Sequence, residues 1–431
     1  MGIHQSAVFS DRGAQELDGF AASLDRTREA LPLGFVTAAD LSAFRDEVRQ
    51  FLHEHVPADL ACRPRMMMSL REDVVRWQRI LAERGWGAPA WPREHGGAGW
   101  TTQQCIIFEE ECVAAGTPTQ DIVGQKLLGP VVNSFGNAEQ KAEHIPLILN
   151  GDRLWCQGFS EPQAGSDLAA IRTRAERHGD NYVVNGVKSL ISHAQQADWI
   201  FLLVRTGEAV TGRAGISILL ADLRSPGISV RPIRSIAGFH HLNEITFDNV
   251  VVPSGNRIGA ENEGWSITKF FLDGSHAASA DLPALRAYLW QLKELGGSER
   301  VGGKLLIEQH EFASRLARFE AELEAVAMMV TRVAAMDQAQ DRSPAARALG
   351  SMLKLRGTEL QQRLTDFLVE ALGDYGAIRG TIDQSNEDPF APLPHFARNI
   401  ASEMFFRRGA TIYGGSSEIQ RCIIAKTMFG L

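Results

Sequence analysis

Two segments of the chain combine small residues with hydroxyl and acidic side chains in a way that suits binding of a large anion. The first spans residues 157–167, with the sequence Gln-Gly-Phe-Ser-Glu-Pro-Gln-Ala-Gly-Ser-Asp, and the second spans residues 414–420, Gly-Gly-Ser-Ser-Glu-Ile-Gln. Glycine lets the backbone approach a ligand closely, and clustered N–H and hydroxyl donors form an anion-binding concavity. The same donors stabilise negative charge that develops on a bound group. Both segments are therefore candidates for holding a large anionic cofactor.

The region ahead of the first segment has the pattern of helices. Apolar residues after Asp40 keep a 3.6-residue period, Asp40 is a suitable N-cap, and Pro57 is expected to stop the helix. Residues 1–36 form a polar extension in which residues 15–31 have a helical pattern. We therefore expect an N-terminal helical domain over residues 1–154.

The apolar period changes to two from Trp155 to about Pro253, which is typical of strands. Asn185-Gly186 suits a type I′ turn, so residues 181–184 and 187–192 are expected to pair as a β-hairpin. Further strands are expected at residues 199–205, 215–222, 228–233 and 244–252. Short strands at this spacing predict an antiparallel β domain, a barrel or a sandwich, over residues 155–260.

The helical pattern returns after Gly264. An apolar stripe from Phe312 to Met329 is interpreted as the core of a helical bundle rather than as a binding groove. Pro344 is expected to begin another long helix that runs to about Leu372, followed by a loop at residues 380–394. The predicted fold class is α+β, with an N-terminal helical domain, a central antiparallel β domain and a C-terminal helical bundle over residues 261–431.

Composition narrows the possible partners. The chain has 431 residues, and its 44 Lys and Arg against 52 Asp and Glu give a net charge of −8, so we expect no nucleic-acid partner. It has no 18-residue apolar run that would predict a membrane span, and its start lacks the pattern of a secretory signal. The 5 cysteines are odd in number and lack C-x-x-C spacing, so they are expected to be reduced thiols in a cytoplasmic protein.

Taken together, these segments resemble the acyl-CoA dehydrogenase family, whose FAD lies across the two segments described first. The resemblance runs from about Asp40 to Leu431 and includes further features in the family's order. These are Trp91-Pro92 with the following Gly-Gly-x-Gly, Phe135-Gly136, Asn185-Gly186-x-Lys188, Gly264-Trp265 and Ile419-Gln420-Arg421. The resemblance implies the three-part fold above, FAD as cofactor, no metal, and an oxidoreductase that acts on the CH–CH group of an acyl-CoA thioester in lipid catabolism.

The resemblance also implies a set of FAD contacts. The segment with Gln157, Phe159 and Ser160 would lie along the flavin ring, and Ser166 would approach the pyrophosphate. In a second flavin segment, residues 188–192, Ser192 keeps the hydroxyl that bonds flavin N5, whereas Leu190 replaces an aromatic residue that usually flanks the ring. Ser416 and Glu418 match positions that hold the adenosine half.

Three further positions resemble residues that a neighbouring subunit contributes to the same cofactor. Glu370 and Gly373 match a short motif of this kind, and Arg300 is a candidate for the arginine that reaches the pyrophosphate, although its motif is one residue short. An FAD site completed in trans implies a homo-oligomer, a dimer or tetramer, or a heteromer with a related subunit. An electron-transfer flavoprotein is a candidate electron acceptor.

The chain departs from the family at the catalytic base. The family removes the α-proton of the thioester with a glutamate while a hydride passes to flavin N5, and the two positions that carry the glutamate are here Gly414 and Ser275. A positioned base contributes roughly 10²–10⁴ in rate. Three interpretations are open: Asp273 or His276 replaces it, a partner chain supplies it, or the chemistry has changed to that of a flavin oxidase or monooxygenase.

The expected function is therefore FAD-dependent α,β-dehydrogenation of an acyl-CoA thioester by a chain whose own base is absent or displaced. The alternative from another class is an FAD-holding subunit of a heteromeric dehydrogenase with no chemistry of its own. The small residues Gly274 and Ser275 favour a bulky or cyclic acyl group.

Overall fold

The computed structural model describes residues 38–61, 69–207, 212–272, 277–341, 343–377 and 399–431. The candidate base positions Asp273, Ser275 and His276 lie outside these residues, as do the helix predicted at 15–31 and the loop predicted at 380–394. The chain divides into two compact units, Met1–Asp46 and Glu47–Leu431, and every candidate site residue belongs to the second.

Helices precede the sheet, as predicted: α2 (Ala38–His55), α3 (Ala58–Ala61), α4 (Arg71–Glu83), α5 (Thr102–Ala114), a π-helical turn (Val123–Leu128), α6 (Gly129–Phe135) and α7 (Ala138–Asn150). α2 ends ahead of Pro57 as expected, but Asp40 is not its N-cap. The helix begins at Ala38, so Asp40 lies in the first turn, where a carboxylate is favoured by the helix dipole. α7 begins with a capping box between Asn137 and Gln140, and the Gln140 amide also donates to the carbonyl of Arg257 at 2.8 Å.

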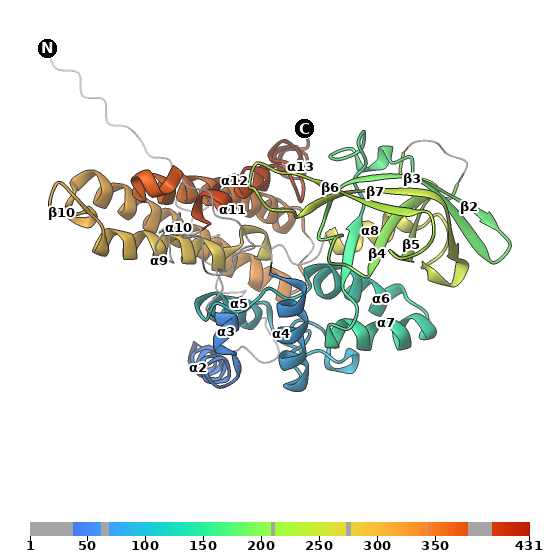
Figure 1. Ribbon diagram of the computed structural model, residues 1–431, viewed down its shortest axis with the longest axis horizontal. Helices are drawn as coiled ribbons and strands as arrows, with labels where there is room; N and C mark the ends of the chain where they lie inside the picture. The colour runs from blue at the N-terminus through green and yellow to red at the C-terminus, as the bar shows by residue number, and fades with distance from the viewer. Residues whose placement is uncertain (1–37, 62–68, 208–211, 273–276, 342, 378–398) are drawn as a thin grey trace, which may run out of the picture. The chain divides into compact units, whose positions relative to one another are not determined.

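The middle of the chain forms an eight-stranded sheet in the order β6-β7-β3-β2-β4-β5-β8, with β1 paired to β4 (Figure 1). Its strands are β1 (Trp155–Gly158), β2 (Arg174–His178), β3 (Asn181–Ser192), β4 (Trp199–Arg205), β5 (Ile216–Asp222), β6 (Ile228–Ile233), β7 (Leu242–Pro253) and β8 (Arg257–Ile258). Most neighbours are antiparallel, but β1 and β2 each pair with β4 in parallel. Over the described residues no pairing joins β6 to β8, so the sheet is open.

The two faces of the central strands bury different cores because successive side chains in a strand point to opposite faces. Phe201 and Leu203 of β4 pack in one cluster with Trp91, whereas Ile200 and Leu202 pack in a second cluster on the other face. This burial on both sides explains why β4 is almost continuously apolar.

The hairpin predicted at Asn185-Gly186 is wrong. β3 runs unbroken from Asn181 to Ser192 with a register shift at this point, and the chain instead turns at Gly179 between β2 and β3. Gly186 is required for close packing: a Cβ there would lie 2.6 Å from the Thr173 hydroxyl oxygen. The glycine therefore marks a bulge rather than a turn.

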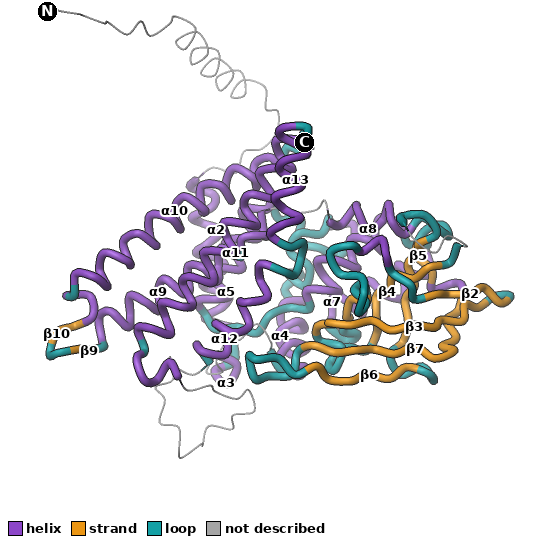
Figure 2. Tube along the Cα trace, turned by 90° about the horizontal axis from the view of Figure 1, so that it is seen from above, coloured by secondary structure: helices purple, strands orange, loops and turns teal. Residues whose placement is uncertain are grey.

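The C-terminal part is a helical bundle made of α8 (Gly264–Leu272), α9 (Leu282–Ser298), α10 (His310–Gln338), α11 (Pro344–Ala371), α12 (Ile400–Arg407) and α13 (Ser417–Phe429), with a small hairpin of β9 (Arg300–Val301) and β10 (Lys304–Leu305). Helices α9, α10 and α11 lie side by side in both views (Figures 1 and 2). The stripe that begins at Phe312 is buried in the bundle core, as predicted. Among the described residues, no helix is both long enough and apolar enough to span a membrane.

Candidate flavin and acyl-thioester site

The two segments predicted to flank a flavin ring are joined directly. The carbonyl of Ser160, just after β1, accepts a hydrogen bond from the backbone N–H of Ser189 in β3 at 2.9 Å. The ammonium of Lys188 donates to the carbonyl of Phe159 at 3.0 Å and to the carboxylate of Glu161 at 2.8 Å. Three contacts therefore fix the first segment against the second.

The centre of this junction is a buried ion pair. The side chains of Glu161 and Lys188 are 2% and 0% exposed, and Glu161 also accepts from the backbone N–H groups of Arg172 and Thr173 at 2.6 and 2.9 Å. Burial lowers the pKa of Lys188 to about 8 although the carboxylate opposes that shift. Burial acts to raise the pKa of Glu161, but the Lys188 ammonium and the donors around it outweigh burial and lower the pKa. The sequence suggested no such partnership, because 27 residues separate the pair.

The loop between Glu161 and Ile171 leaves backbone donors available. Gly165, Ser166 and Asp167 are exposed, and among the described residues none of their N–H groups has a backbone acceptor. Arg205, 1% exposed, holds the end of this loop by donating to the carbonyls of Ala169 and Ile171 at 2.9 and 3.0 Å. A run of free N–H groups with a serine hydroxyl on a braced loop is the arrangement an anion-binding concavity needs.

The second segment ends in a strained residue. Leu190 has φ of 59° and lies in a bulge between Lys188 and Ile191, with 59% of its side chain exposed. A branched apolar residue in the left-handed region is an outlier, and such strain gathers at functional sites. Ser192 at the end of β3 is exposed. Behind the loop, Gln157 lies within β1 and Phe159 packs against Phe201 with ring centroids 5.2 Å apart.

The final segment, residues 414–420, has a glycine, Gly414, at one of the two positions where the family carries its catalytic glutamate. Gly414 has φ of +65°, and a Cβ built on it would meet no atom of the described residues within 4 Å. Ser416 is the N-cap of α13, its hydroxyl accepting from the N–H of Ile419 at 3.3 Å, and the buried Ser417 hydroxyl has no hydrogen-bond partner in the described part of the chain. Glu418 is exposed in the first turn, where the backbone N–H and the Ser416 hydroxyl lower its pKa.

A buried arginine network precedes this open loop. The Arg407 guanidinium donates to the Tyr288 hydroxyl at 2.9 Å, to Glu403 at 2.7 Å and to Asp281 at 3.0 Å. The ammonium of Lys354, 7% exposed, donates to the Ala410 carbonyl at 2.8 Å, and burial lowers its pKa to about 8. The chain up to Gly414 is therefore anchored firmly, whereas the glycine itself is not covered.

The three residues predicted to act in trans gather at one end of the bundle. Arg300 lies exposed in β9 and bonds only the Gly303 carbonyl among the described residues, at 3.1 Å. Glu370, near the end of α11, pairs with Arg315 of α10 at 2.5 Å, and Gly373 follows with φ of +56°. In Figures 1 and 2 the hairpin that carries Arg300 lies at the opposite end of the bundle from α13. The hairpin that carries Arg300 therefore does not lie beside α13 of the same chain.

The residues present fit an FAD. The unpaired N–H groups around Ser166 and the unpartnered Ser417 hydroxyl lie in the two segments predicted to hold its two phosphates and its adenosine half. Among the described residues no cluster of histidine, cysteine and acidic side chains is placed to hold a metal ion.

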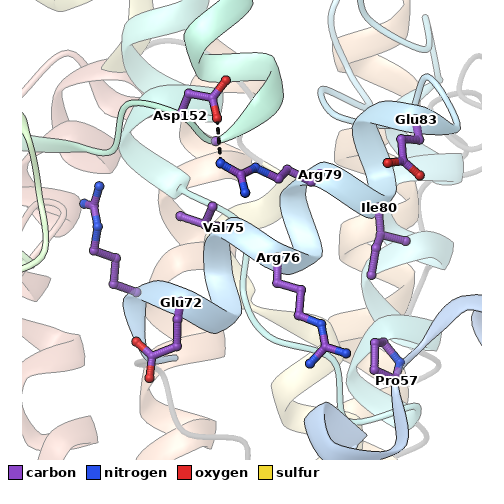
Figure 3. A pocket seen from close by; sticks show the side chains of 10 residues that line it. Pro57, Glu72, Val75, Arg76, Arg79, Ile80, Glu83 and Asp152 are labelled. Carbon is purple, nitrogen blue, oxygen red and sulfur yellow. Dashed lines mark hydrogen bonds and ion pairs between the residues drawn. The ribbon is translucent and has the colours of Figure 1, made fainter.

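A surface hollow of about 600 Å³ lies elsewhere, over α4 and the end of α7 (Figure 3). Its three arginines are all neutralised. Arg71 pairs with Asp198 at 2.8 Å, Arg76 with Asp59 at 2.7 Å and Arg79 with Asp152 at 3.0 Å. Among the described residues that line it, the hollow therefore presents no unpaired cation to an anionic ligand.

Three domain families match the chain nearly end to end. They are the N-terminal, middle and C-terminal domains of acyl-CoA dehydrogenase, matched at residues 38–152, 156–250 and 262–429. The chain is 33% identical over 403 residues to the acyl-CoA dehydrogenase IpdE1 of Mycobacterium tuberculosis, covering 91% of this chain and 98% of the relative. It is 32% identical over 355 residues to the acyl-CoA dehydrogenase FadE26 of the same organism, covering 81% and 86%.

Two solved structures have a similar fold over most of the chain. The Tcur3481-Tcur3483 steroid ACAD matches with a TM-score of 0.79 and 28% identity over 92% of this chain and 98% of that chain. The ChsE4-ChsE5 complex from Mycobacterium tuberculosis matches with a TM-score of 0.75 and 29% identity over 93% and 99%.

Proposed function

The chain belongs to the acyl-CoA dehydrogenase family, whose members are oxidoreductases acting on the CH–CH group of acyl-CoA, and we propose that it binds FAD and lacks a catalytic base of its own. The observation that carries this proposal is the contrast between two parts of the site. The flavin segments are locked together by the buried pair of Glu161 and Lys188, whereas Gly414 offers no side chain. When bound, FAD accepts a hydride from the β-carbon of the acyl group.

In this proposal the residues of the flavin segments and of the start of α13 each have a defined role in holding FAD. The N–H groups around Ser166 bind the pyrophosphate, the hydroxyls of Ser160 and Ser192 orient the flavin ring, and Leu190 covers part of its face. Ser416 and Glu418 hold the adenosine half at the start of α13. Gly414, rather than a glutamate, comes directly after Tyr413, so the α-proton of a bound thioester has no acceptor at that position.

FAD binding is tested by reconstitution. Purified protein incubated with FAD is expected to retain about one flavin per site, with an absorption spectrum shifted from that of free FAD. Ser166→Ala should weaken retention, whereas Ser254→Ala, in the short turn after β7, should not. A preparation that retains no flavin would refute the proposal.

We propose in addition that the functional form is an oligomer, and that a related chain carrying the glutamate completes the site. α13 has apolar side chains that this chain alone leaves exposed: Ile419, Ile423, Met428 and Phe429 are 36%, 36%, 46% and 70% exposed. Glu370 pairs with Arg315 near the start of α10, and Gly373 follows it in the chain. Arg300 lies in the hairpin just before α10, which Figures 1 and 2 show at the opposite end of the bundle from α13. The similar structures named above include the ChsE4-ChsE5 complex.

Assembly is tested by sedimentation of the FAD-loaded protein at micromolar concentration. A flavin-loaded monomer would contradict the shared site. Phe429→Glu is expected to weaken the oligomer, whereas Ile236→Glu, an equally exposed apolar residue on the loop after β6, should leave it intact.

A second candidate function is that of a complete dehydrogenase with a displaced base. Asp273 and His276 lie in the segment between α8 and α9, next to Ser275, which favours them as replacements. We propose a bulky or cyclic acyl group in either case, because glycine and serine occupy positions 414, 274 and 275.

A further inference from the structure

The Lys188 ammonium is bonded to a peptide group of the first flavin segment as well as to a carboxylate. It lies 3.0 Å from the carbonyl oxygen of Phe159 and 2.8 Å from the carboxylate of Glu161, and its side chain is 0% exposed. Because the side chain is out of contact with solvent, its positive charge is screened much less than that of a surface lysine. The charge therefore acts strongly on the peptide group that the ammonium contacts.

The peptide unit between Phe159 and Ser160 transmits the effect of this charge to its other side. In a planar trans unit the carbonyl and the N–H point in opposite directions. Since the Phe159 carbonyl points to Lys188, the Ser160 N–H points away from it. Ser160 is half-buried, and among the described residues its N–H has no backbone acceptor. A carbonyl that accepts from a cation polarises its peptide unit, which makes the N–H of that unit a stronger donor.

The second flavin segment holds this peptide unit in place. The N–H of Ser189, the residue after Lys188, donates to the Ser160 carbonyl at 2.9 Å. Successive side chains of a strand point to opposite faces, so the buried side chain of Lys188 and the half-buried side chain of Ser189 lie on opposite sides of β3. The ammonium therefore lies behind the two segments that are proposed to line the flavin ring.

The carboxylate of Glu161 does not cancel the effect of the ammonium on this peptide unit. Besides Lys188, three donors of the loop and strand that follow bind its two oxygens: the side-chain amide of Gln163 at 2.7 Å and the backbone N–H groups of Arg172 and Thr173 at 2.6 and 2.9 Å. The negative charge is thus shared among donors on the far side of the pair, whereas the ammonium contacts the carbonyl directly.

Stability alone does not account for a lysine at this position. An ion pair in a protein interior usually contributes no more stability than an apolar pair of the same volume, because desolvation of the two charges offsets their attraction. Burial lowers the pKa of Lys188 to about 8 although Glu161 opposes that shift, so keeping the side chain charged has a cost. A charge kept at such a cost behind a cofactor segment points to a role in the chemistry of the cofactor.

We propose that Lys188 is a positioning residue for bound FAD and favours its reduced form. The inference rests on the proposed function, because it concerns the flavin of that site. A hydride from the β-carbon brings two electrons and one proton, so the flavin ring gains one negative charge. The Ser160 N–H, polarised by the ammonium through the Phe159 carbonyl, stabilises that charge. Lys188 thus acts through Ser160 rather than by touching the substrate, and it raises the midpoint potential of the flavin.

The test measures the two-electron midpoint potential of bound FAD by anaerobic reduction against a reference dye at pH 7, where Lys188 is charged. The unmodified protein is expected to have a potential above that of free FAD. Lys188→Met should weaken the preference for reduced over oxidised FAD about 10- to 100-fold, which lowers the potential by about 30 to 60 mV. Lys188→Met combined with Glu161→Gln should regain stability but keep the lowered potential, because the ammonium is still absent. A purely structural role would restore both.

Two matched controls separate the charge from stability and from net charge. Leu219→Ala removes a fully buried side chain of β5, so it should destabilise the sheet without changing the potential. Lys293→Met removes a surface ammonium that pairs with Glu320 at 2.5 Å, and it should also leave the potential unchanged.

Two results would overturn the inference while leaving the proposed function standing. One is an equal potential for the unmodified protein and the double variant of Lys188 and Glu161. The other is a potential of the unmodified protein at or below that of free FAD, which also decides the case in which a variant fails to retain the flavin. If the unmodified protein retains no FAD, the proposed function fails, and the inference fails with it.

Discussion

The two halves of the candidate site are built in opposite ways. Where the flavin segments meet, a lysine and a glutamate are fully buried, and the Glu161 carboxylate is further bound by two backbone N–H groups. Around Gly414, no atom of the described part of the chain lies within 4 Å of a built Cβ, and the Ser417 hydroxyl has no hydrogen-bond partner there. Apolar side chains of α13 are exposed as well. The chain fixes the two flavin segments against each other with its own residues and places no carboxylate side chain at position 414. This difference is the basis of the proposal that the proton acceptor comes from elsewhere.

Breaking the buried pair should produce the largest loss. Lys188→Met leaves the carboxylate of Glu161 buried without its cation, and removing one partner of a buried pair costs about 3–5 kcal/mol. Urea unfolding should show this drop in the free energy of unfolding, and FAD retention should fall with it, because the two flavin segments lose their link.

Two variants control that experiment. Lys188→Met combined with Glu161→Gln removes both charges of the pair and keeps one amide oxygen as an acceptor for the N–H groups of Arg172 and Thr173, so it should recover part of the lost stability. Lys293→Met breaks an exposed pair and should cost at most about 1 kcal/mol. If Lys188→Met cost no more than Lys293→Met, the cofactor half would not be the rigid part of the site.

Acidification should act on the second flavin segment through His193. Burial and the nearby His241 lower the pKa of His193 to about 4, whereas an unfolded histidine has a pKa of about 6.5. As pH falls from about 6.5 to 4, the unfolded state binds the proton first, so the native state loses stability by at most about 3 kcal/mol from this group.

His193→Asn should flatten that part of the pH dependence, measured by urea unfolding between pH 7 and pH 4. Asparagine tolerates the positive φ of 62° at this position, so the backbone is preserved. His178→Asn, at an exposed position in β2, is the control and should leave the curve unchanged. If the free energy of unfolding of His193→Asn depended on pH in the same way as that of the unmodified protein, the histidine would not be buried in its neutral form.

Leu190 should give the smallest effect on stability. Its side chain is mostly exposed and its φ is positive, so glycine relieves strain of about 1–2 kcal/mol while adding a comparable entropic cost in the unfolded chain. Leu190→Gly is expected to change the free energy of unfolding by less than about 1 kcal/mol. In the same variant, a change in the fluorescence of bound FAD should reveal greater solvent access to the flavin ring.

Leu219→Ala in β5 is the matched comparison, because Leu219 is fully buried, and it should cost about 2–5 kcal/mol. A loss for Leu190→Gly as large as that for Leu219→Ala would mean that Leu190 supports the sheet rather than the cofactor.

Regular strands and helices were predictable where one residue pattern dominates. β4 and β6 have the bounds expected from their apolar runs and turn residues, and the long stripe of α10 is in the core. The turn predicted at Asn185-Gly186 was wrong because the same dipeptide suits both a turn and a bulge. Only the packing of Gly186 against Thr173 distinguishes the two conformations.

The candidate site was predictable as segments but not as contacts. Residues 157–167 and 188–192 were identified from their composition and resemblance, yet the pair of Glu161 and Lys188 depends on strands brought together by the sheet. Arg407 meets Asp281 across 126 residues, a separation for which local patterns carry no signal. The missing carboxylate at Gly414 was visible in the sequence, whereas the empty space beside it required the structure.

We propose that this chain holds FAD but has no proton acceptor of its own, and anaerobic mixing with a saturated acyl-CoA that it binds tests this proposal. The unmodified protein, loaded with FAD and free of other chains, is predicted to keep its yellow colour over the time of the measurement. Gly414→Glu should be bleached, and Ser275→Glu likewise, with a gain of at most roughly 10²–10⁴ in rate. The gain at Gly414 is limited by the strain of a side chain at φ of +65°.

Rapid bleaching of the unmodified protein would contradict the claim. Loss of that bleaching in His276→Ala or Asp273→Asn would then identify the residue that takes the proton.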